Sequence, residues 1–218
     1  CATFKDRPGQ ADMLHMDLWW RGQNIAIDPG TYSYNAPKLW NNPLAHTAYH
    51  NTVTVDDMDQ MNRVGKFLWF PWIRSRVLTM KRSVSRKLAY WEGEHDGYQR
   101  LSDPVIHRRG ILHISEDVWL VLDYLESKKL HKFRLHWLFL DCPCEWRPEA
   151  GELILQTPRG TYYVYVFSTA YHPQQSLVRA DEKSPRGWKA PYYSYREPAL
   201  SLAIEARAST TLFTTLFT

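Results

Sequence analysis

Three residues in the first quarter of the chain carry side chains that bind divalent metal ions. His15 and His50 offer imidazole nitrogens, and Asp28 offers a carboxylate. Two nitrogens and one carboxylate form a natural ligand set for zinc, with a fourth position left for water or substrate. Because these residues are far apart in the sequence, only a folded sheet can bring them together. We therefore expect them to converge from three separate strands on one metal site.

Each of the three residues also has an ordinary structural role open to it. A single histidine is more often a surface residue or a hydrogen-bonded core residue than a metal ligand. Asp28 follows an apolar segment and precedes Pro29-Gly30, where its carboxylate needs a partner. That partner is either a metal ion or the backbone N–H groups of its own turn. The spacing alone does not separate these interpretations.

The segments around these residues have the pattern of β-strands. Residues 14–20 alternate with a period of two, which predicts a strand. A turn at 21–23 leads to a second strand at 24–28, and we expect the two to pair antiparallel. Pro29-Gly30 suits a type II turn, because proline fixes φ and glycine accepts the positive φ that follows. Residues 49–55 alternate again and predict a third strand.

The remainder of the chain also has a β pattern, and no convincing amphipathic helix interrupts it. Turn residues recur about every ten residues, which is typical of a sandwich rather than of alternating strands and helices. Since no Gly- or Ser-rich linker divides the chain, we predict one all-β domain over residues 1–218, a large antiparallel β-sandwich (supersandwich type) with many short strands. The further strands are expected at 76–82, 87–94, 105–113, 118–124, 132–139, 153–157, 162–168 and 200–206, followed by a C-terminal strand pair or frayed end.

Composition argues against several classes of protein. The chain has 218 residues and a net charge of +4, without the run of basic residues that indicates nucleic-acid binding. No stretch of about 18 apolar residues is present, so no membrane span is expected. Three cysteines make no disulfide framework. The 10 Trp, 13 Tyr and 8 Phe fit a β-rich core, although an exposed subset would also make a platform for stacking sugars.

Several motifs occur in an order that resembles the heparinase II/III family of polysaccharide lyases. The series covers roughly residues 10–140, and the ordered set is far more specific than any one member. The motifs are His15-Met-Asp17, Asp28-Pro-Gly-Thr-Tyr-Ser-Tyr34, Thr47-Ala-Tyr-His50-Asn-Thr-Val-Thr-Val-Asp56 with Asp59-Gln60, His107-Arg-Arg-Gly-Ile-Leu, and Trp119-Leu-Val-Leu-Asp123-Tyr.

The resemblance implies a fold, a metal site and a reaction. It implies a C-terminal β-sandwich joined to an N-terminal α/α toroid, and a zinc-type site formed by His15, Asp28 and His50. The family cleaves uronate-containing polysaccharides, such as glycosaminoglycans or alginate, by β-elimination. A base removes the proton at C5 and an acid assists departure of the glycosidic oxygen. It also implies a periplasmic or secreted protein.

Two features limit what the resemblance implies for catalysis by this chain. Family enzymes often place a catalytic histidine two residues before the metal histidine, where this chain has Met13. Methionine cannot transfer a proton, and the neighbouring Asp12 would point to the opposite face of a strand. The family's catalytic tyrosine and its Asn or His partner lie in the toroid. The chain starts at Cys1 without an initiator methionine or signal peptide, so we expect a fragment that is inactive alone.

Two further residues are candidates for the sugar cleft. Tyr34 ends the Asp-Pro-Gly turn motif and is the candidate catalytic or substrate-facing hydroxyl, with a packed tyrosine as the alternative. Arg63 is the candidate to pair with a uronate carboxylate, with surface solvation as the alternative. We therefore carry two hypotheses, the β-sandwich domain of a polysaccharide lyase and a non-catalytic carbohydrate-binding or scaffolding sandwich. Met13 favours the second.

Overall fold

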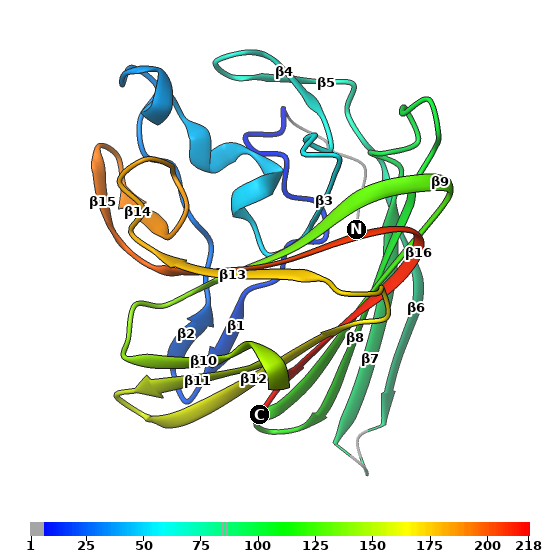
Figure 1. Cartoon of the computed structure of the whole chain (residues 1–218), viewed down its shortest axis with the longest axis vertical. Coiled ribbons are helices and arrows are strands. Elements are labelled where there is room, and N and C mark those ends of the chain that lie inside the picture. Colours follow the sequence, from blue (N-terminus) through cyan, green and yellow to red (C-terminus); the bar gives the residue numbers. More distant parts are fainter. Residues whose placement is uncertain (1–6, 84, 86) are drawn as a thin grey trace.

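The computed structural model describes residues 7–83, 85 and 87–218, and most of these residues lie in antiparallel strands (Figure 1). The largest sheet has twelve strands, eight of which follow the order β10-β11-β12-β16-β9-β8-β7-β6, while β1, β2, β3 and β13 join it beside this path. Its strands are β1 (Leu18–Trp20), β2 (Gln23–Ala26), β3 (Val53–Val55), β6 (Ser75–Ser83), β7 (Leu88–His95), β8 (Ile106–Ser115), β9 (Val118–Phe139), β10 (Cys144–Arg147), β11 (Glu152–Thr157), β12 (Gly160–Ser168), β13 (Gln174–Arg179) and β16 (Leu200–Phe217).

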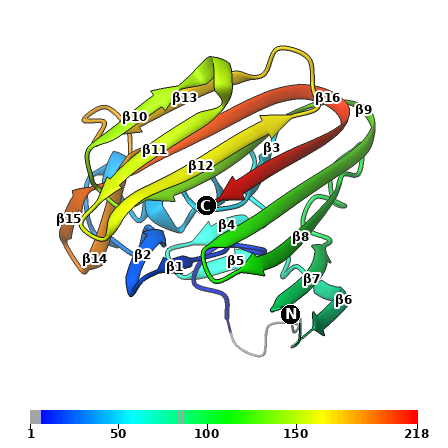
Figure 2. The same ribbon diagram turned by 90° about the horizontal axis from the view of Figure 1, so that it is seen from below.

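Two long strands form the spine of this sheet. The 22-residue β9 pairs with the 18-residue β16 from Leu200↔Phe139 to Phe217↔Trp119, with a register shift between Ala208 and Thr210. Figure 2 shows the sheet curling along these strands, with β6–β8 on one side and β10–β13 on the other. The curved sheet surrounds its own apolar core, so the all-β fold class predicted from the sequence is confirmed. The strands of the spine are much longer than the short ones expected.

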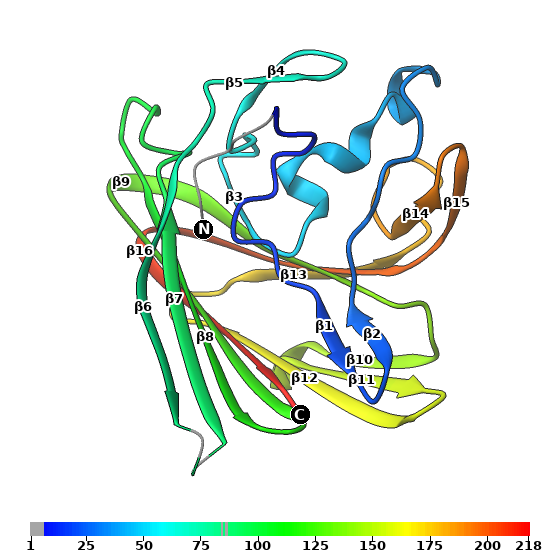
Figure 3. The same ribbon diagram turned by 180° about the vertical axis from the view of Figure 1, so that it is seen from behind.

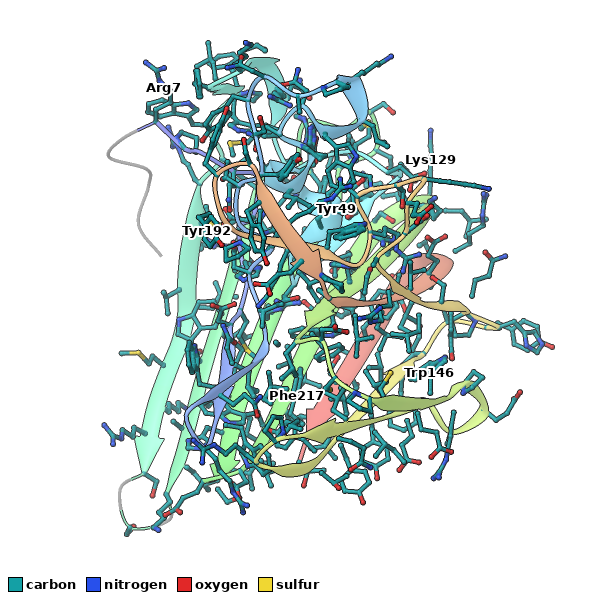
Figure 4. The ribbon with its side chains drawn as sticks, turned by 90° about the vertical axis from the view of Figure 1, so that its left-hand side faces the viewer. Arg7, Tyr49, Lys129, Trp146, Tyr192 and Phe217 are labelled. Carbon is teal, nitrogen blue, oxygen red and sulfur yellow. The ribbon has the colours of Figure 1, made fainter. Side chains whose placement is uncertain are left out.

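Aromatic residues on the concave face fill the core. Phe133, Trp137 and Phe139 alternate along β9 and are fully buried. The ring of Phe217 from β16 meets Trp137 edge-on at 5.0 Å between centroids, and Figure 4 shows Phe217 inside the curve of the sheet. Burying a large aromatic side chain stabilises the fold by roughly 1.5–3 kcal/mol. The β-rich-core interpretation of the aromatics holds for this set.

A layer of loops covers one end of the sheet (Figure 3). It contains the 3₁₀ turns η1 (Lys38–Trp40), η2 (Pro43–Ala45) and η3 (Thr47–Tyr49), and the hairpins β4 (Asn62–Gly65) with β5 (Leu68–Phe70) and β14 (Trp188–Tyr192) with β15 (Tyr195–Pro198). A second apolar cluster of Ala11, Ala45, Met61, Trp69 and Ile73 lies beneath it. A further 3₁₀ turn, η4 (Pro148–Ala150), joins β10 to β11.

The predicted hairpin at 14–28 is present but shorter than expected. β1 and β2 pair antiparallel around Arg21-Gly22. Residues 14–17 are not part of the strand, because Leu14 has a φ of 63° and the His15 amide donates to the Asp12 carbonyl at 2.8 Å. Likewise, the strand expected at 49–55 starts only at Val53, since Tyr49 ends η3 and residues 50–52 form a bend.

Other sequence expectations are corrected or supported in the same way. The segments 118–124 and 132–139 are one strand, β9, and the C-terminus continues the strand predicted at 200–206 as β16. Cys142 and Cys144 are free thiols, while Cys1 lies outside the described residues. Within the part of the chain that the structure describes, no helix is long and apolar enough to cross a membrane.

His131 on β9 links two acidic loops. Its Nδ1 lies 2.6 Å from Asp56 Oδ2 and its Nε2 lies 3.1 Å from Asp103 Oδ2. Burial alone lowers the pKa of His131, but the hydrogen bonds and charges of the two carboxylates outweigh it, so the pKa lies above its usual value. The charged imidazole therefore stabilises the folded state below the unfolded-state pKa of about 6.5.

We expect His131→Gln to lower the thermal unfolding midpoint by a few degrees at about pH 5.5, and by less at about pH 8.5. The reason is that the stabilisation is lost as pH rises through the raised folded-state pKa. Thermal midpoints of both proteins at the two pH values measure the effect, with the exposed His172→Gln as control. An equal or larger loss at high pH would show that the charged form of His131 contributes nothing.

Candidate metal centre

His15, Asp28 and His50 meet at one point, as the sequence predicts. Asp28 Oδ2 lies 3.6 Å from His15 Nε2 and 3.4 Å from His50 Nδ1, and all potential ligand atoms lie within 4.8 Å of one another. Two atoms bound to zinc at 2.0–2.1 Å with a tetrahedral angle are about 3.4 Å apart. The three side chains thus form a group with the spacing to hold a metal ion. They come from loops beside β1, β2 and β3 rather than from within three strands.

Asp28 makes the turn interaction that the sequence allows, and its second carboxylate oxygen faces the two histidines. Its Oδ1 accepts the Gly30 N–H at 2.7 Å, which is the turn interaction, while Oδ2 faces the two histidines. Burial raises the pKa of Asp28, but His50, His15 and the Gly30 amide outweigh burial and hold the pKa below its usual value. Gly30 has a φ of 73°, and a Cβ there would lie 2.1 Å from the Ala190 carbonyl oxygen. Glycine is therefore required for the turn to pack against β14.

His50 is the most deeply buried member of the group. Its side chain is fully buried, and neither ring nitrogen hydrogen-bonds to any residue that the structure describes. The ring meets His15 edge-on at 5.2 Å between centroids. A buried polar group without a hydrogen bond costs about 1–3 kcal/mol, so an imidazole in this position needs another partner. This is the observation that best fits a metal site.

Asn51 joins the three ligand segments. Its Nδ2 donates to the carbonyls of Met16 at 2.9 Å and Ile27 at 3.1 Å, which are neighbours of His15 and Asp28. Its Oδ1 accepts the Leu138 N–H of β9 at 2.6 Å. Its own amide donates to His15 Nδ1 at 3.0 Å. One fully buried side chain thus fixes the loops before β1, after β2 and before β3 on the central sheet.

A buried ion pair between β8 and β9 supports two of the same loops. Arg109 donates through Nε and Nη2 to the two oxygens of Asp123 at 2.7 and 2.9 Å, and its Nη1 donates to the carbonyls of Leu14 and Asn51 at 2.6 and 2.5 Å. Both side chains are fully buried. Burial raises the pKa of Asp123, but Arg109 and His107 outweigh burial and lower the pKa to about 2. The pair therefore stays charged and holds the backbone on either side of the site.

A chain of neutral histidines completes the support of Asp123. The Gly97 amide donates to His95 Nδ1 at 3.1 Å, so the proton of His95 is on Nε2, which lies 3.1 Å from His107 Nδ1. His107 in turn donates from Nε2 to Asp123 Oδ1 at 2.8 Å. Burial lowers the pKa of both histidines, although Asp123 opposes the effect at His107. Every ring nitrogen of His95 and His107 therefore has a partner.

His136 supports the His50 backbone. Its Nδ1 donates to the His50 carbonyl at 3.0 Å, and its Nε2 accepts from the Ser201 hydroxyl at 2.7 Å. Burial, followed by the charge of Arg134, lowers the pKa of His136 well below its usual range. The ring therefore acts as a neutral bridge between β16 and the His50 loop.

The structure does not bring Tyr34 or Arg63 into contact with the metal triad. Tyr34 is partly exposed, and its ring packs edge-on against Phe67 at 4.5 Å. Arg63 donates from Nη1 to the Asn41 carbonyl at 2.9 Å. Met13 packs on the apolar cluster around Trp69, and its backbone is held by the Gln60 side chain at 2.7 and 3.0 Å.

Sequence reasoning missed the residues that position the triad. Asn51, Arg109 and Asp123 all lie inside the motifs that carry the family resemblance, but their roles depend on contacts between distant segments. Arg109, for example, reaches the Leu14 carbonyl across 95 residues. The one available signal was the aspartate in the apolar run Trp119-Leu-Val-Leu-Asp123, where a buried charge needs a partner.

We expect Asn51→Ala to destabilise the domain by about 3–5 kcal/mol, because it leaves two carbonyls and one amide buried without partners. Asn35→Ala is the control, since Asn35 is exposed and its side-chain oxygen accepts a single bond from Lys66. It should cost less than about 0.5 kcal/mol. Urea unfolding of both variants measures the difference. A loss below about 1 kcal/mol for Asn51→Ala would contradict the role given to this side chain.

Comparison with known proteins supports the fold. The chain superposes on a heparinase III gene product with a TM-score of 0.77 at 16% identity, covering 95% of this chain and 30% of that one. Heparan sulfate lyase HepC from Pedobacter heparinus gives 0.75 at 17% identity, again covering 95% and 30%. This chain therefore spans about a third or less of the length of these structures. A comparison with curated protein sequences gives no match.

The family assignment comes from the sequence itself. A family model described as "Heparinase II/III-like, C-terminal" matches residues 2–213, which is nearly the whole chain. The motif series that resembles heparinase II/III lyases lies within this match. The chain belongs to the heparinase II/III-like C-terminal domain family.

Proposed function

We propose that this domain is part of a polysaccharide lyase that cleaves anionic, uronate-bearing glycans by β-elimination, and that His15, Asp28 and His50 hold a divalent metal ion in it. The observation that carries the proposal is the fully buried His50 imidazole, which has no hydrogen bond to either nitrogen and faces Asp28 Oδ2 at 3.4 Å. In a domain of the heparinase II/III-like family, a shared metal ion gives this imidazole its missing partner.

Zinc is the ion that the donor set favours. Imidazole nitrogens with one carboxylate suit zinc better than calcium or magnesium, which prefer oxygen ligands. When bound, the ion would neutralise Asp28 and fix three loops to one another, which makes its role structural. Those loops would form one wall of the sugar cleft.

Metal binding requires a change at His15. At present the Asn51 amide donates to Nδ1, so the neutral ring carries its proton on Nε2, which lies 3.1 Å from Asp17 Oδ1. For Nε2 to hold a metal ion, the remaining ring proton must be on Nδ1. The Nδ1–H and the Asn51 N–H would then face each other as two donors. The loop or the ring must therefore adjust when an ion binds.

We further propose that Tyr34 and Arg63 face the substrate. The Tyr34 hydroxyl hydrogen-bonds to no described residue, and the ring lies between Phe67 and Tyr193. Arg63 has no acidic partner among the described residues, so its guanidinium can pair with a uronate carboxylate if it leaves the Asn41 carbonyl.

An N-terminal helical toroid is the proposed partner of this domain. The similar solved structures are about three times longer than this chain, and the family resemblance implies that the toroid supplies the catalytic tyrosine with its Asn or His partner. The same resemblance favours a periplasmic or secreted protein.

A non-catalytic carbohydrate-binding domain is the second candidate. Tyr192 and Tyr195 are stacked with an interplanar angle of 11° and are 62% and 45% exposed, which suits them for stacking on sugar rings. Met13, in place of a catalytic histidine, also fits this role. Figure 4 shows Tyr192 on the β14–β15 hairpin.

We expect the purified domain to carry about one zinc ion per chain and His50→Ala to lose it, because a tetrahedral site with two protein ligands binds poorly. Elemental analysis after dialysis measures the content. His172→Ala, at an exposed position, should keep the ion. A wild-type domain that stays metal-free after incubation with zinc would refute the metal assignment.

We expect the full-length protein to release unsaturated uronate products from an anionic polysaccharide, and these 218 residues alone to release little or none, because the family resemblance implies that the toroid supplies the catalytic tyrosine and its Asn or His partner. Ultraviolet absorbance of the unsaturated product measures both. Strong activity from the 218 residues alone would show that cleavage does not need catalytic residues from the toroid. A full-length protein that binds glycans without cleaving any uronate polymer would favour the second candidate.

A further inference from the structure

His46 and Asp59 form a histidine–carboxylate pair that the metal centre does not use. His46 Nδ1 lies 2.6 Å from Asp59 Oδ2, and Asp59 Oδ1 accepts the Thr47 N–H at 2.8 Å. The Arg100 guanidinium donates to the Asp59 carbonyl and so fixes its backbone. Because the carboxylate accepts the Nδ1 proton, the neutral ring has its lone pair on Nε2. This is the arrangement by which an oriented imidazole acts as a general base.

The pair borders a cavity large enough for a sugar residue. The cavity has a volume of about 640 Å³ and is also lined by Lys38, Tyr49 and Pro185. Small-molecule sites commonly have volumes of about 300–1,000 Å³. The His46 side chain is 30% exposed, and its Nε2 has no hydrogen-bond partner among residues 7–83, 85 and 87–218. Figure 4 labels Tyr49, the last residue of η3 in the loop layer.

Lys38 is a cation of the cavity lining that could pair with an anionic ligand. Asp57 is paired with Lys132 at 2.5 Å, and Asp59 is paired with His46. Lys38, in contrast, has no acidic group within 4 Å among the described residues. A carboxylate entering the cavity can therefore pair with the Lys38 ammonium group, while the His46 imidazole lines the same cavity. Neutralising a uronate carboxylate in this way makes its C5 proton easier to remove.

The pair is also close to the site of the absent histidine. Met13 packs on the cluster of Ala11, Ala45, Met61, Trp69 and Ile73, and the His46 ring meets Trp69 of that cluster edge-on at 5.3 Å between centroids. Both side chains thus contact one small apolar cluster from different loops.

We propose that His46, oriented by Asp59, is a catalytic base of this protein and that Lys38 binds the uronate carboxylate. The proposal rests on the lyase function proposed above. Nε2 of His46 takes the C5 proton, and the C5–H electron pair forms the C4=C5 double bond. The C4–O bond breaks, and the leaving oxygen takes a proton from water. The imidazolium then returns its proton to solvent.

The test is steady-state kinetics of the full-length protein with an anionic uronate polymer. We expect His46→Ala to lower kcat by about 100-fold or more, as the loss of a general base does, with little change in KM. Added imidazole should restore part of the activity, because it can occupy the vacated space. Asp59→Asn should also lower kcat. Lys38→Met should raise KM and also lower kcat, because Lys38 both binds the carboxylate and eases removal of the C5 proton. The control His172→Ala, at an exposed position outside the cavity, should change neither.

The outcomes separate this proposal from the function on which it rests. An active wild-type protein with a fully active His46→Ala variant would overturn the role of His46 and leave the lyase function standing. A second contradicting outcome is a loss of activity in His46→Ala that added imidazole does not restore. If the thermal midpoints of His46→Ala and of the conservative His46→Gln variant then show intact folding, this result would also overturn the role of His46. A wild-type protein that cleaves no uronate polymer would overturn both.

Discussion

The loops that carry His15, Asp28 and His50 are held in place by buried polar groups, and the geometry of the candidate metal site depends on these groups. Asn51 bridges the three loops through its side chain, and the Arg109–Asp123 pair holds two of the same loops from below. A buried charge without its partner is costly, and breaking such a pair costs about 3–5 kcal/mol. Each group in this network has its partners, which is why loops without regular structure can place His15, Asp28 and His50 within 4.8 Å.

The same network explains why the central strand must bend. Asp123 and Leu138 lie on β9 and would be about 50 Å apart in a straight strand. Yet Leu138 bonds directly to Asn51, and Asp123 reaches Asn51 through a single arginine side chain. The curvature of β9 and β16 visible in Figures 1 and 2 therefore does more than close the core. It brings two distant positions of one strand to the base of the ligand site.

The sequence predicts the fold class, the hairpin around Arg21-Gly22 and the metal triad, because these depend on local patterns and on an ordered series of motifs. It does not predict the strand length of β9, since Ser127 to Leu130 break the apolar alternation and read as a turn. Nor does it predict the partners of Asn51 and Arg109, which are contacts across 14 to 95 residues. His46 has no local signature either, because its pairing with Asp59 depends on how the loop folds over Trp69.

The central claim is that His15, Asp28 and His50 share one divalent metal ion. Anomalous X-ray diffraction from crystals of the zinc-loaded domain, recorded on both sides of the zinc absorption edge, tests it most directly. We predict one strong anomalous peak about 2.0–2.2 Å from Asp28 Oδ2, His15 Nε2 and a ring nitrogen of His50. The absence of a peak there, with His50 still buried and Asp28 still facing it, would contradict the claim.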